Sequence, residues 1–239
     1  MGERKWCWLG GLPVTPMGRR EVLVFAGGLA LLAGGLAFFS PWAALPPALL
    51  AVFVAWFFRD PHRLVPNAPG AFVAPADGVV THAEEVAECD FWEGPAVRVS
   101  IYLSVFDVHV NRVPETARVV EVRYRPGRFR NTWHADTARD NEQCWTLFRC
   151  EAPPHPLFAV RQVAGTFARR IVCEAKPGAV LGRGDRFGMI KFGSRTELYL
   201  APAPRLHITA RPGDRVRAGS SVLAHYTVAG PEVGPELGP

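Results

Sequence analysis

The hydrophobic and polar positions divide the chain into an apolar N-terminal segment and a longer body of alternating character. The segment from Val22 to Phe58 contains no Asp, Glu, Lys or Arg. A single helix of that length would exceed the roughly 20 residues that cross a bilayer. Ser40-Pro41 and Pro46-Pro47 interrupt the segment near its middle, where helices should stop. We therefore predict two apolar helices, about 22–39 and 43–58, joined by a tight proline-rich turn.

Basic residues flank this predicted hairpin at both ends. They are Arg4, Lys5, Arg19 and Arg20 before it, and Arg59 and Arg63 after it. Because basic residues favour the cytoplasmic side, we expect both ends there and attachment to the cytoplasmic face of the cell membrane. A cleaved signal peptide would have a shorter apolar core. A helical hairpin buried against protein is the alternative, since the first helix is rich in glycine in its second half.

The body of the chain changes to short segments that alternate or are rich in β-branched residues, bounded by Gly, Pro, Asp and Asn. These segments are 78–81, 96–103, 117–124, 145–148 and 158–163. Residues 168–173 fit a strand or a short helical turn, and no long segment shows the helical period. We predict a mainly β fold, a barrel or sandwich, preceded by the helical hairpin. The expected domains are the hairpin over 1–63 and a β-rich domain over 64–239.

Two late segments, Pro177–Gly188 and Pro212–Ser220, resemble each other and the hairpins of biotinyl and lipoyl carrier barrels. In such hairpins Gly and Asp supply the turns, and an intervening Val faces the core. The repeat is short, so it predicts local architecture only.

Composition and charge narrow the class of protein. The apolar fraction of 49% and the charged fraction of 21% are those of a folded chain. The net charge of +5 permits an acidic partner, and with the apolar hairpin we expect a membrane surface and no nucleic acid. The five cysteines are odd in number and show no C-x-x-C spacing, which argues against a disulfide framework and a zinc site. The histidines also lack ligand spacing, so we expect no metal.

The segment Phe187–Arg195 carries one candidate for chemistry. A short apolar run leads directly into Gly193-Ser194. Glycine allows backbone geometries and close approaches that other residues do not. Ser194 places a hydroxyl next to the carbonyl that precedes it, which is the minimum requirement for an N→O acyl shift. Most Gly-Ser pairs lie in solvated turns, so the pair alone is a weak signal.

Two further segments contain candidate acid and base groups. Asp77 precedes a β-branched pair, which indicates a turn into a strand or a carboxylate that orients a histidine. In an extended chain Asp107, His109 and Asn111 share one face. Three polar groups on one face of an apolar strand are costly to bury without a purpose, which favours a site there. Other histidines that could approach it are His82 and His134.

Taken in order, these segments resemble phosphatidylserine decarboxylase proenzymes of the short bacterial and archaeal form, over roughly residues 20–227. The motifs that carry the resemblance are Phe57–Pro61, Pro75–Val79, Ser104–Pro114, Tyr124–Phe129, Asn141-Glu142 and Arg186–Arg195. Any one of them is weak, whereas six in order with compatible spacing are specific.

The resemblance implies an autocleaved pyruvoyl enzyme. Ser194 would attack the Gly193 carbonyl, and the chain would split into a β fragment, 1–193, and an α fragment, 194–239, which form a heterodimer. Ser194 would become a covalent pyruvoyl group, the pyruvate cofactor, which forms a Schiff base with the substrate amine and draws electrons as CO2 leaves. By residue match, His109 is the base and later the proton donor, and Asp77 is the carboxylate that orients it.

One position departs from the longer family members. They carry a second histidine three residues after the first, and Arg112 stands there in this chain. His109 would then serve both steps, or His82 or His134 would take one of them. The sequence leaves this open.

The resemblance implies a serine-headgroup phospholipid as substrate, phosphatidylserine being converted to phosphatidylethanolamine. An archaeal ether-linked analogue, archaetidylserine, fits the same chemistry. A membrane-tethered, non-enzymatic module of the biotinyl or lipoyl kind is the alternative from another class. The chain has no Met-Lys-Met-like or Asp-Lys-Ala-like attachment site, which argues against that module. The sequence leaves open the oligomeric state and whether the hairpin spans the bilayer.

Overall fold

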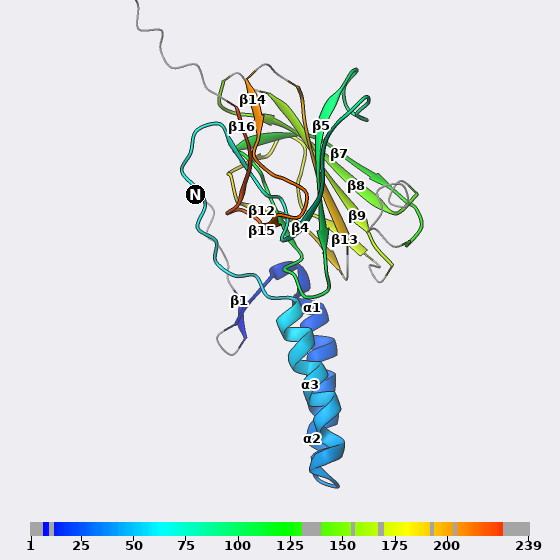
Figure 1. Ribbon diagram of the computed structural model, residues 1–239. Coiled ribbons are helices and arrows are strands. Elements are labelled where there is room, and N and C mark those ends of the chain that lie inside the picture. The colour runs from blue at the N-terminus through cyan, green and yellow to red at the C-terminus, as the bar shows by residue number, and fades with distance from the viewer. Residues whose placement is uncertain are drawn as a thin grey trace, which may run out of the picture.

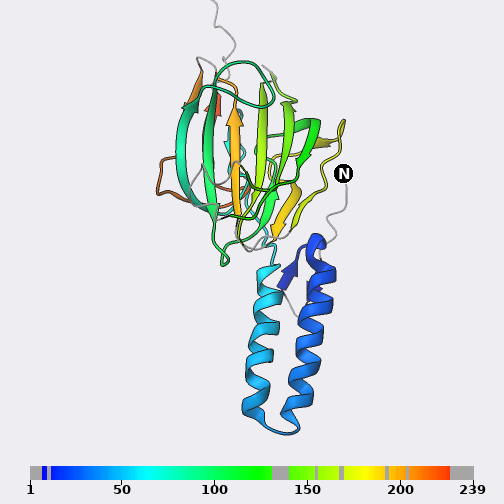
Figure 2. The same cartoon turned by 90° about the vertical axis from the view of Figure 1, so that its right-hand side faces the viewer.

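The computed structural model describes residues 7–9, 12–130, 140–153, 156–166, 170–191, 194–202 and 205–226. It consists of a β-rich body from which a pair of antiparallel helices projects (Figures 1 and 2). The mainly β fold with a preceding apolar helical hairpin, predicted from the sequence, is confirmed.

The hairpin is formed by two helical arms. The first arm contains η1 (Pro16–Gly18), α1 (Arg19–Glu21), the π-helical η2 (Val22–Ala26) and α2 (Gly27–Ala37). The second arm is α3 (Pro41–Phe57), which begins at Pro41 and continues through Pro46 and Pro47. The expectation that helices stop at these prolines is therefore wrong for 46–47. Each proline removes one backbone hydrogen bond, and the packing of α3 along the first arm stabilises the helix despite this loss.

The surface of the hairpin is apolar over most of its length. The first arm, Pro16–Ala37, is 22 residues long and apolar enough to cross a membrane by length and composition. Large apolar side chains at the distal turn face outward, with Phe38 88%, Phe39 85% and Trp42 80% exposed. Such a surface is costly in water. The alternative of a hairpin buried against protein does not hold within this chain.

The body is built around one large antiparallel sheet. Its strands, in spatial order, are β11 (Val180–Leu181), β7 (Ala117–Arg125), β8 (Gln143–Cys150), β9 (Leu157–Ala164), β13 (Ser194–Leu200), β5 (Ala96–Leu103), β4 (Gly78–Val86) and β15 (Arg215–Val216). Two smaller sheets cover one face of it, one formed by β10 (Arg170–Cys173), β12 (Arg186–Lys191) and β6 (Val110–Arg112), and the other by β14 (Leu206–Ile208), β16 (Val222–Tyr226) and β3 (Ala71–Val73). A short pair, β1 (Cys7–Leu9) and β2 (Leu12–Val14), precedes the hairpin.

The core lies between the large sheet and the two smaller sheets. Alternate residues of each strand point into it, and Phe148 stacks on Phe158 with ring centroids 4.9 Å apart. The strands predicted from alternation are all present. The ambiguous segment at 168–173 is a strand from Arg170 onward.

The two similar late segments adopt the same local structure. Gly178 and Gly213 both have positive φ, as do Gly184 and Gly219 six residues later in each segment. The segments form the two outermost strands of the large sheet, β11 and β15, at opposite edges. Their similarity therefore reflects a repeated short edge strand between two glycines of positive φ, and neither segment forms the hairpin that the sequence predicts, because β11 pairs with β7 and β15 with β4.

The junction between helices and body, which we call the hairpin root, is an apolar cluster. It consists of Val14, Val22, Phe57, Phe58 and Met189. Phe57 and Phe58 are fully buried. Beside them the Asp60 carboxylate, 1% exposed, pairs with Arg112 at 2.6 Å and with Arg186. The hairpin is thus joined to the body by packed and charged groups, and it is not attached through a flexible linker.

Candidate active site

Ser194 is the first residue of β13, a central strand of the large sheet. Its backbone lies between Leu103 of β5 and Ala164 of β9. The side chain is fully buried, and its Oγ has no hydrogen-bond partner among the described residues. Buried hydroxyls are nearly always bonded, so an unpaired one marks a candidate reactive group. Gly193, the other half of the predicted cleavage site, lies outside the described residues.

The face of β13 that carries Ser194 is held to β6 by a polar contact. Two residues after Ser194, the Thr196 Oγ1 accepts a hydrogen bond from Asn111 Nδ2 at 3.1 Å. Asn111 Oδ1 in turn accepts from Gln162 Nε2 at 2.8 Å. These hydrogen bonds connect three buried polar side chains and join the small sheet to the large one. Asn111, singled out from the sequence, therefore positions strands near the serine.

His109 lies immediately before β6, beside the end of β12 that leads into Ser194. Its backbone carbonyl accepts a hydrogen bond from Ile190 N at 3.2 Å. Asn111 contacts Thr196, and His109 and Ser194 each lie two residues before one of these partners. The side chains of His109 and Ser194 therefore belong to the same end of the body. The histidine and serine segments therefore both adjoin the end of β12, and the role of His109 as the base stays a prediction.

The environment of His109 favours a neutral imidazole. The ring is fully buried and packs on Phe57 of the hairpin root, with centroids 4.5 Å apart. Burial lowers the pKa of His109 to about 4, against the opposing effect of the Asp107 carbonyl and carboxylate. The Asp107 carbonyl oxygen lies 2.9 Å from Nδ1. A carbonyl only accepts, so Nδ1 carries the proton and Nε2 carries the lone pair that a base needs.

Asp77 lies at the start of β4, at the same end of the large sheet. Its Oδ2 pairs with Arg63 Nη2 at 2.6 Å, and its Oδ1 accepts from Ala218 N at 2.8 Å. Burial raises the pKa of this carboxyl, and Arg63 opposes the shift. The partners described for Asp77 are thus a guanidinium and a backbone amide. Its predicted role in orienting a histidine stays a prediction.

The expected common face of residues 107, 109 and 111 is only partly present. The extended strand β6 begins at Val110, and Asp107 lies in the preceding turn. Its Oδ2 accepts from Ser104 N at 2.8 Å and from Ser104 Oγ at 2.7 Å. Asp107 therefore closes the turn that presents His109, because a carboxylate bonded to nearby backbone favours a turn over a strand.

Arg59, which the sequence presents only as a basic flank of the hairpin, lies at the edge of this site. Its guanidinium lies over the Trp56 ring, 3.6 Å from the centroid, and donates to the Phe106 carbonyl at 2.7 Å. Burial lowers the pKa of Arg59, and the nearby charges of Asp77 and Asp107 oppose the shift. The aromatic run before Arg59-Asp60-Pro61 is typical, by sequence, of a membrane-interface belt. Its aromatic members Phe57 and Phe58 are instead buried in the hairpin root.

The other candidate bases from the sequence are His82 and His134, and Arg112 stands where longer relatives have a second histidine. His82 lies on β4, with Nδ1 3.0 Å from Thr81 Oγ1. His134 lies outside the described residues. Arg112, at the position of the second histidine of longer relatives, is buried and donates to Gly184 O at 2.9 Å and to Asp60. Arg112 is therefore part of the junction with the hairpin and supplies no base.

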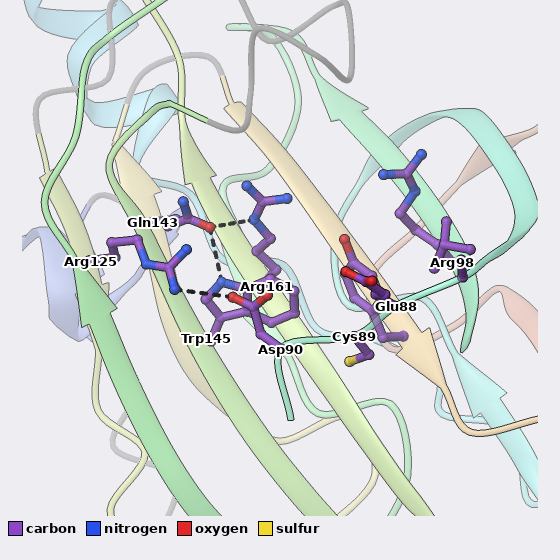
Figure 3. A pocket seen from close by; sticks show the side chains of 11 residues that line it. Glu88, Cys89, Asp90, Arg98, Arg125, Gln143, Trp145 and Arg161 are labelled. Carbon is purple, nitrogen blue, oxygen red and sulfur yellow. Dashed lines mark hydrogen bonds and ion pairs between the residues drawn. The ribbon is translucent and has the colours of Figure 1, made fainter. Parts of the chain in front are cut away.

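A cavity of about 380 Å³ lies on the opposite face of the large sheet (Figure 3). Arg98, Arg125 and Arg161 line it together with Trp145 and Tyr199. Each of the three guanidiniums already has a carboxylate partner: Glu84, Asp90 and Glu197, respectively. Because residues alternate along β13, Ser194 points away from this face. The cavity is therefore separate from the serine site.

A search for metal ligands within the described ranges finds no group of three or more His, Cys, Asp or Glu side chains that could hold an ion.

Comparison with known proteins gives consistent matches over most of the chain. A family model described as phosphatidylserine decarboxylase matches residues 50–224, a range that includes His109 and Ser194. A phosphatidylserine decarboxylase proenzyme of Rhodopirellula baltica is 43% identical over 223 residues, which cover 92% of this chain and 90% of that protein. The proenzyme of Symbiobacterium thermophilum is 46% identical over 209 residues, covering 87% and 95%. That of Carboxydothermus hydrogenoformans is 42% identical over 182 residues, covering 76% and 84%.

Proposed function

Since this chain belongs to the phosphatidylserine decarboxylase family of carboxy-lyases, we propose that it acts through a pyruvoyl group made from its own Ser194 by cleavage after Gly193. The observation that carries the proposal is the buried Oγ of Ser194 at the start of β13, which has no hydrogen-bond partner in the part of the chain that the structure describes. A hydroxyl kept from water and from hydrogen bonds is available as a nucleophile.

The self-cleavage consumes one water and releases one ammonia. Ser194 Oγ attacks the Gly193 carbonyl carbon, the C–N bond breaks, and an ester joins the two residues. Removal of the Ser194 α-proton then expels the Gly193 carboxylate, which becomes the new C-terminus of 1–193. The dehydroalanine left on 194–239 hydrolyses to a pyruvoyl group and ammonia. The fit to this group rests on a serine that is buried and free of competing bonds.

His109 is the residue we assign to the proton transfers. With a pKa of about 4 it is neutral at pH 7, and its Nε2 can take the hydroxyl proton and return it to the departing amide nitrogen. Phe57 and the Asp107 carbonyl fix the ring, so little reorganisation is needed during the transfer. In the mature enzyme the same ring would protonate the substrate carbon after CO2 has left. The pyruvoyl carbonyl would bind the substrate amine and draw electrons from the breaking C–C bond.

The hairpin supports a membrane-bound lipid substrate. Its exposed apolar side chains suit the bilayer, with the body at the cytoplasmic face. Arg59 and Arg63 lie just after α3, where the body meets the hairpin. Cations in that position would attract an anionic headgroup. We therefore propose a serine-headgroup phospholipid as substrate, acted on by a heterodimer of the fragments 1–193 and 194–239.

The proposal is tested by the mass of the purified protein and by two serine variants. We expect wild type to separate on a denaturing gel into 1–193 and 194–239, with the smaller fragment blocked to Edman degradation. Ser194→Ala should remain one chain. Ser220→Ala is the matched control, because Gly219-Ser220 is also a Gly-Ser pair but lies in a turn, and it should cleave as wild type does.

An intact wild-type chain in a preparation that releases CO2 from phosphatidylserine would refute the pyruvoyl proposal, as would cleavage of Ser194→Ala. CO2 release from diacyl and from ether-linked serine phospholipids distinguishes phosphatidylserine from the archaeal alternative.

A further inference from the structure

The strand that leads into the proposed cleavage site is held at both ends by groups that adjoin the membrane hairpin. β12 begins at Arg186, which pairs with Asp60 just after α3. It ends at Lys191, whose Nζ pairs with the Glu21 carboxylate of the first helical arm. Ser194 follows Lys191 by three residues.

The contact between Lys191 and Glu21 is unusual for a lysine. Its side chain is only 8% exposed, and that of Glu21 is 24% exposed. Lysine is rarely buried unless it is paired, because removing its charge from water is costly. The two residues are 170 positions apart in the sequence. Such a contact restrains the end of β12 relative to the hairpin.

Apolar packing acts on the same face of β12. Met189 alternates with Lys191 and is fully buried in the hairpin root against Val22 and Phe58. Ile190, on the other face, packs in a separate cluster with Ala164. The face of β12 that packs against the hairpin root therefore makes an apolar contact through Met189 and a charged contact through Lys191. These are the last two residues of β12 on that face before the proposed cleavage site.

The residues of the hairpin root are closely packed. Thr15 N donates to the Phe58 carbonyl at 3.0 Å, and a Cβ on Gly18 would lie 2.1 Å from the Phe58 ring. Phe57, next in the same cluster, holds the His109 ring. The strand that precedes the proposed cleavage site and the residue that we assign as base are thus both packed against the hairpin root.

We propose that the hairpin root is a clamp for self-cleavage. Glu21 and Lys191 are positioning residues that fix the chain just before Ser194, so that the Ser194 hydroxyl can attack the Gly193 carbonyl. The inference rests on the proposed function and adds a role for the hairpin besides attachment to the membrane. Errors of about 1 Å in such a geometry cost on the order of a hundredfold in rate. Loss of the pair should therefore slow cleavage much more than it alters folding.

The test measures the rate at which newly made full-length chain splits. Protein is synthesised in a cell-free system with lipid nanodiscs, synthesis is stopped, and the appearance of the 1–193 fragment is followed on gels. We expect Glu21→Gln and Lys191→Met each to slow cleavage by roughly ten- to a hundredfold. The double variant should be no slower than either single one. Lys191→Arg, which keeps the charge, should restore most of the rate.

A second buried ion pair provides the matched control. Arg183 and Glu115 have side chains 12% and 10% exposed, and they join two segments of the body that are 68 positions apart in the sequence. Glu115→Gln should lower the melting temperature at least as much as Glu21→Gln does, yet cleave at nearly the wild-type rate.

Two outcomes would overturn the inference. One is a Glu21→Gln chain that cleaves as wild type does. The other is a loss of rate that follows the loss of melting temperature equally in Glu21→Gln and Glu115→Gln, since that would be a structural effect alone. If wild type itself did not split at Gly193–Ser194, the proposed function would fail first, and the two failures are thereby distinguishable.

Discussion

Replacing Glu197 by glutamine should destabilise the fold strongly. Glu197 lies on β13 three residues after Ser194 and is fully buried. It shares a face of the strand with Tyr199, which lines the cavity of Figure 3. Its carboxylate accepts from Tyr199 Oη at 2.8 Å, from Arg161 Nη1 at 3.1 Å and from Ser100 Oγ at 3.2 Å. Arg195 Nη1 lies 3.8 Å away.

The magnitude follows from the charges that the substitution leaves behind. Arg161 and Arg195, 6% and 0% exposed, would lose the carboxylate that they share while they remain buried. Breaking a buried ion pair from one side costs about 3–5 kcal/mol. A typical domain has a free energy of unfolding of about 5–15 kcal/mol. We therefore expect Glu197→Gln to remove a large part of the stability. A pair at the surface gives a contrast: Glu84, 45% exposed, binds Arg98, and Glu84→Gln should cost at most about 1 kcal/mol.

The pH dependence has a definite sign. Burial raises the pKa of Glu197, but neighbouring positive charges and a hydrogen bond lower it by more, so that it lies below the usual 4.5. These groups are Arg161, Arg98, Arg195 and the Tyr199 hydroxyl. A lowered folded-state pKa means that the unfolded chain binds the proton first. The stabilisation is therefore complete above pH 4.5 and is lost as the pH falls below that value. The difference in stability between wild type and Glu197→Gln should narrow in the same range.

Urea unfolding in detergent micelles, followed by tryptophan fluorescence, measures these differences. Both variants are made in the Ser194→Ala background, so that one uncleaved chain unfolds and the midpoint can be interpreted. Trp145 lies within the network, 4.9 Å from the Tyr199 ring, and reports its loss. A cost of less than 1 kcal/mol for Glu197→Gln, or equal costs for Glu197→Gln and Glu84→Gln, would refute the reasoning.

Two further predictions concern the ends of β6 and β4. His109→Gln should abolish most self-cleavage, measured as the fraction of 1–193 on gels. The pKa of His109 in the folded protein, about 4, lies below the ordinary 6.5. The free energy of unfolding of wild type should therefore fall by about 3 kcal/mol between pH 6.5 and pH 4, and that of the variant should not. Equal pH dependence of both proteins would contradict the assigned environment. Gly78→Ala should cost more than about 3 kcal/mol, because φ is +147° and the new Cβ would lie 2.1 Å from the Tyr102 carbonyl oxygen. Gly94→Ala, with φ +98° and open space around it, should cost only about 1 kcal/mol, and similar urea midpoints for the two variants would rule out the steric argument.

The elements of this fold could be predicted because each has a local cause in the sequence. Alternation along 96–103 and 117–124 fixes which side chains face the core, and the strands β5 and β7 follow the same residues. The apolar run from Val22 to Phe58 dictates a hairpin by its length alone. Pro46-Pro47 misled us, since local propensity is weaker than packing along a neighbouring helix.

The partners of charged residues could not be predicted, because they depend on distant parts of the chain. The sequence 194–200 begins with four polar residues in succession, which is typical of an exposed segment, yet the whole of β13 is buried. The ion pairs of Asp77, Asp60 and Lys191 join segments 14 to 170 positions apart. Nothing in the local pattern of Asp77 distinguishes a partner histidine from Arg63.

The two faces of β13 differ in how well their polar groups are hydrogen-bonded. This difference explains why the strand can carry the reactive group that we propose. On one face Ser194 has a buried hydroxyl with no hydrogen-bond partner among the described residues, and an unpaired buried hydroxyl costs about 1–3 kcal/mol of stability. On the other face Arg195, Glu197 and Tyr199 are fully paired, and they fix the strand on either side of the same peptide groups. A strand held so firmly from behind cannot shift to give Ser194 a partner. An unsatisfied nucleophile can therefore persist in a central strand only where the opposite face is satisfied, and weakening Glu197 should disturb self-cleavage as well as stability.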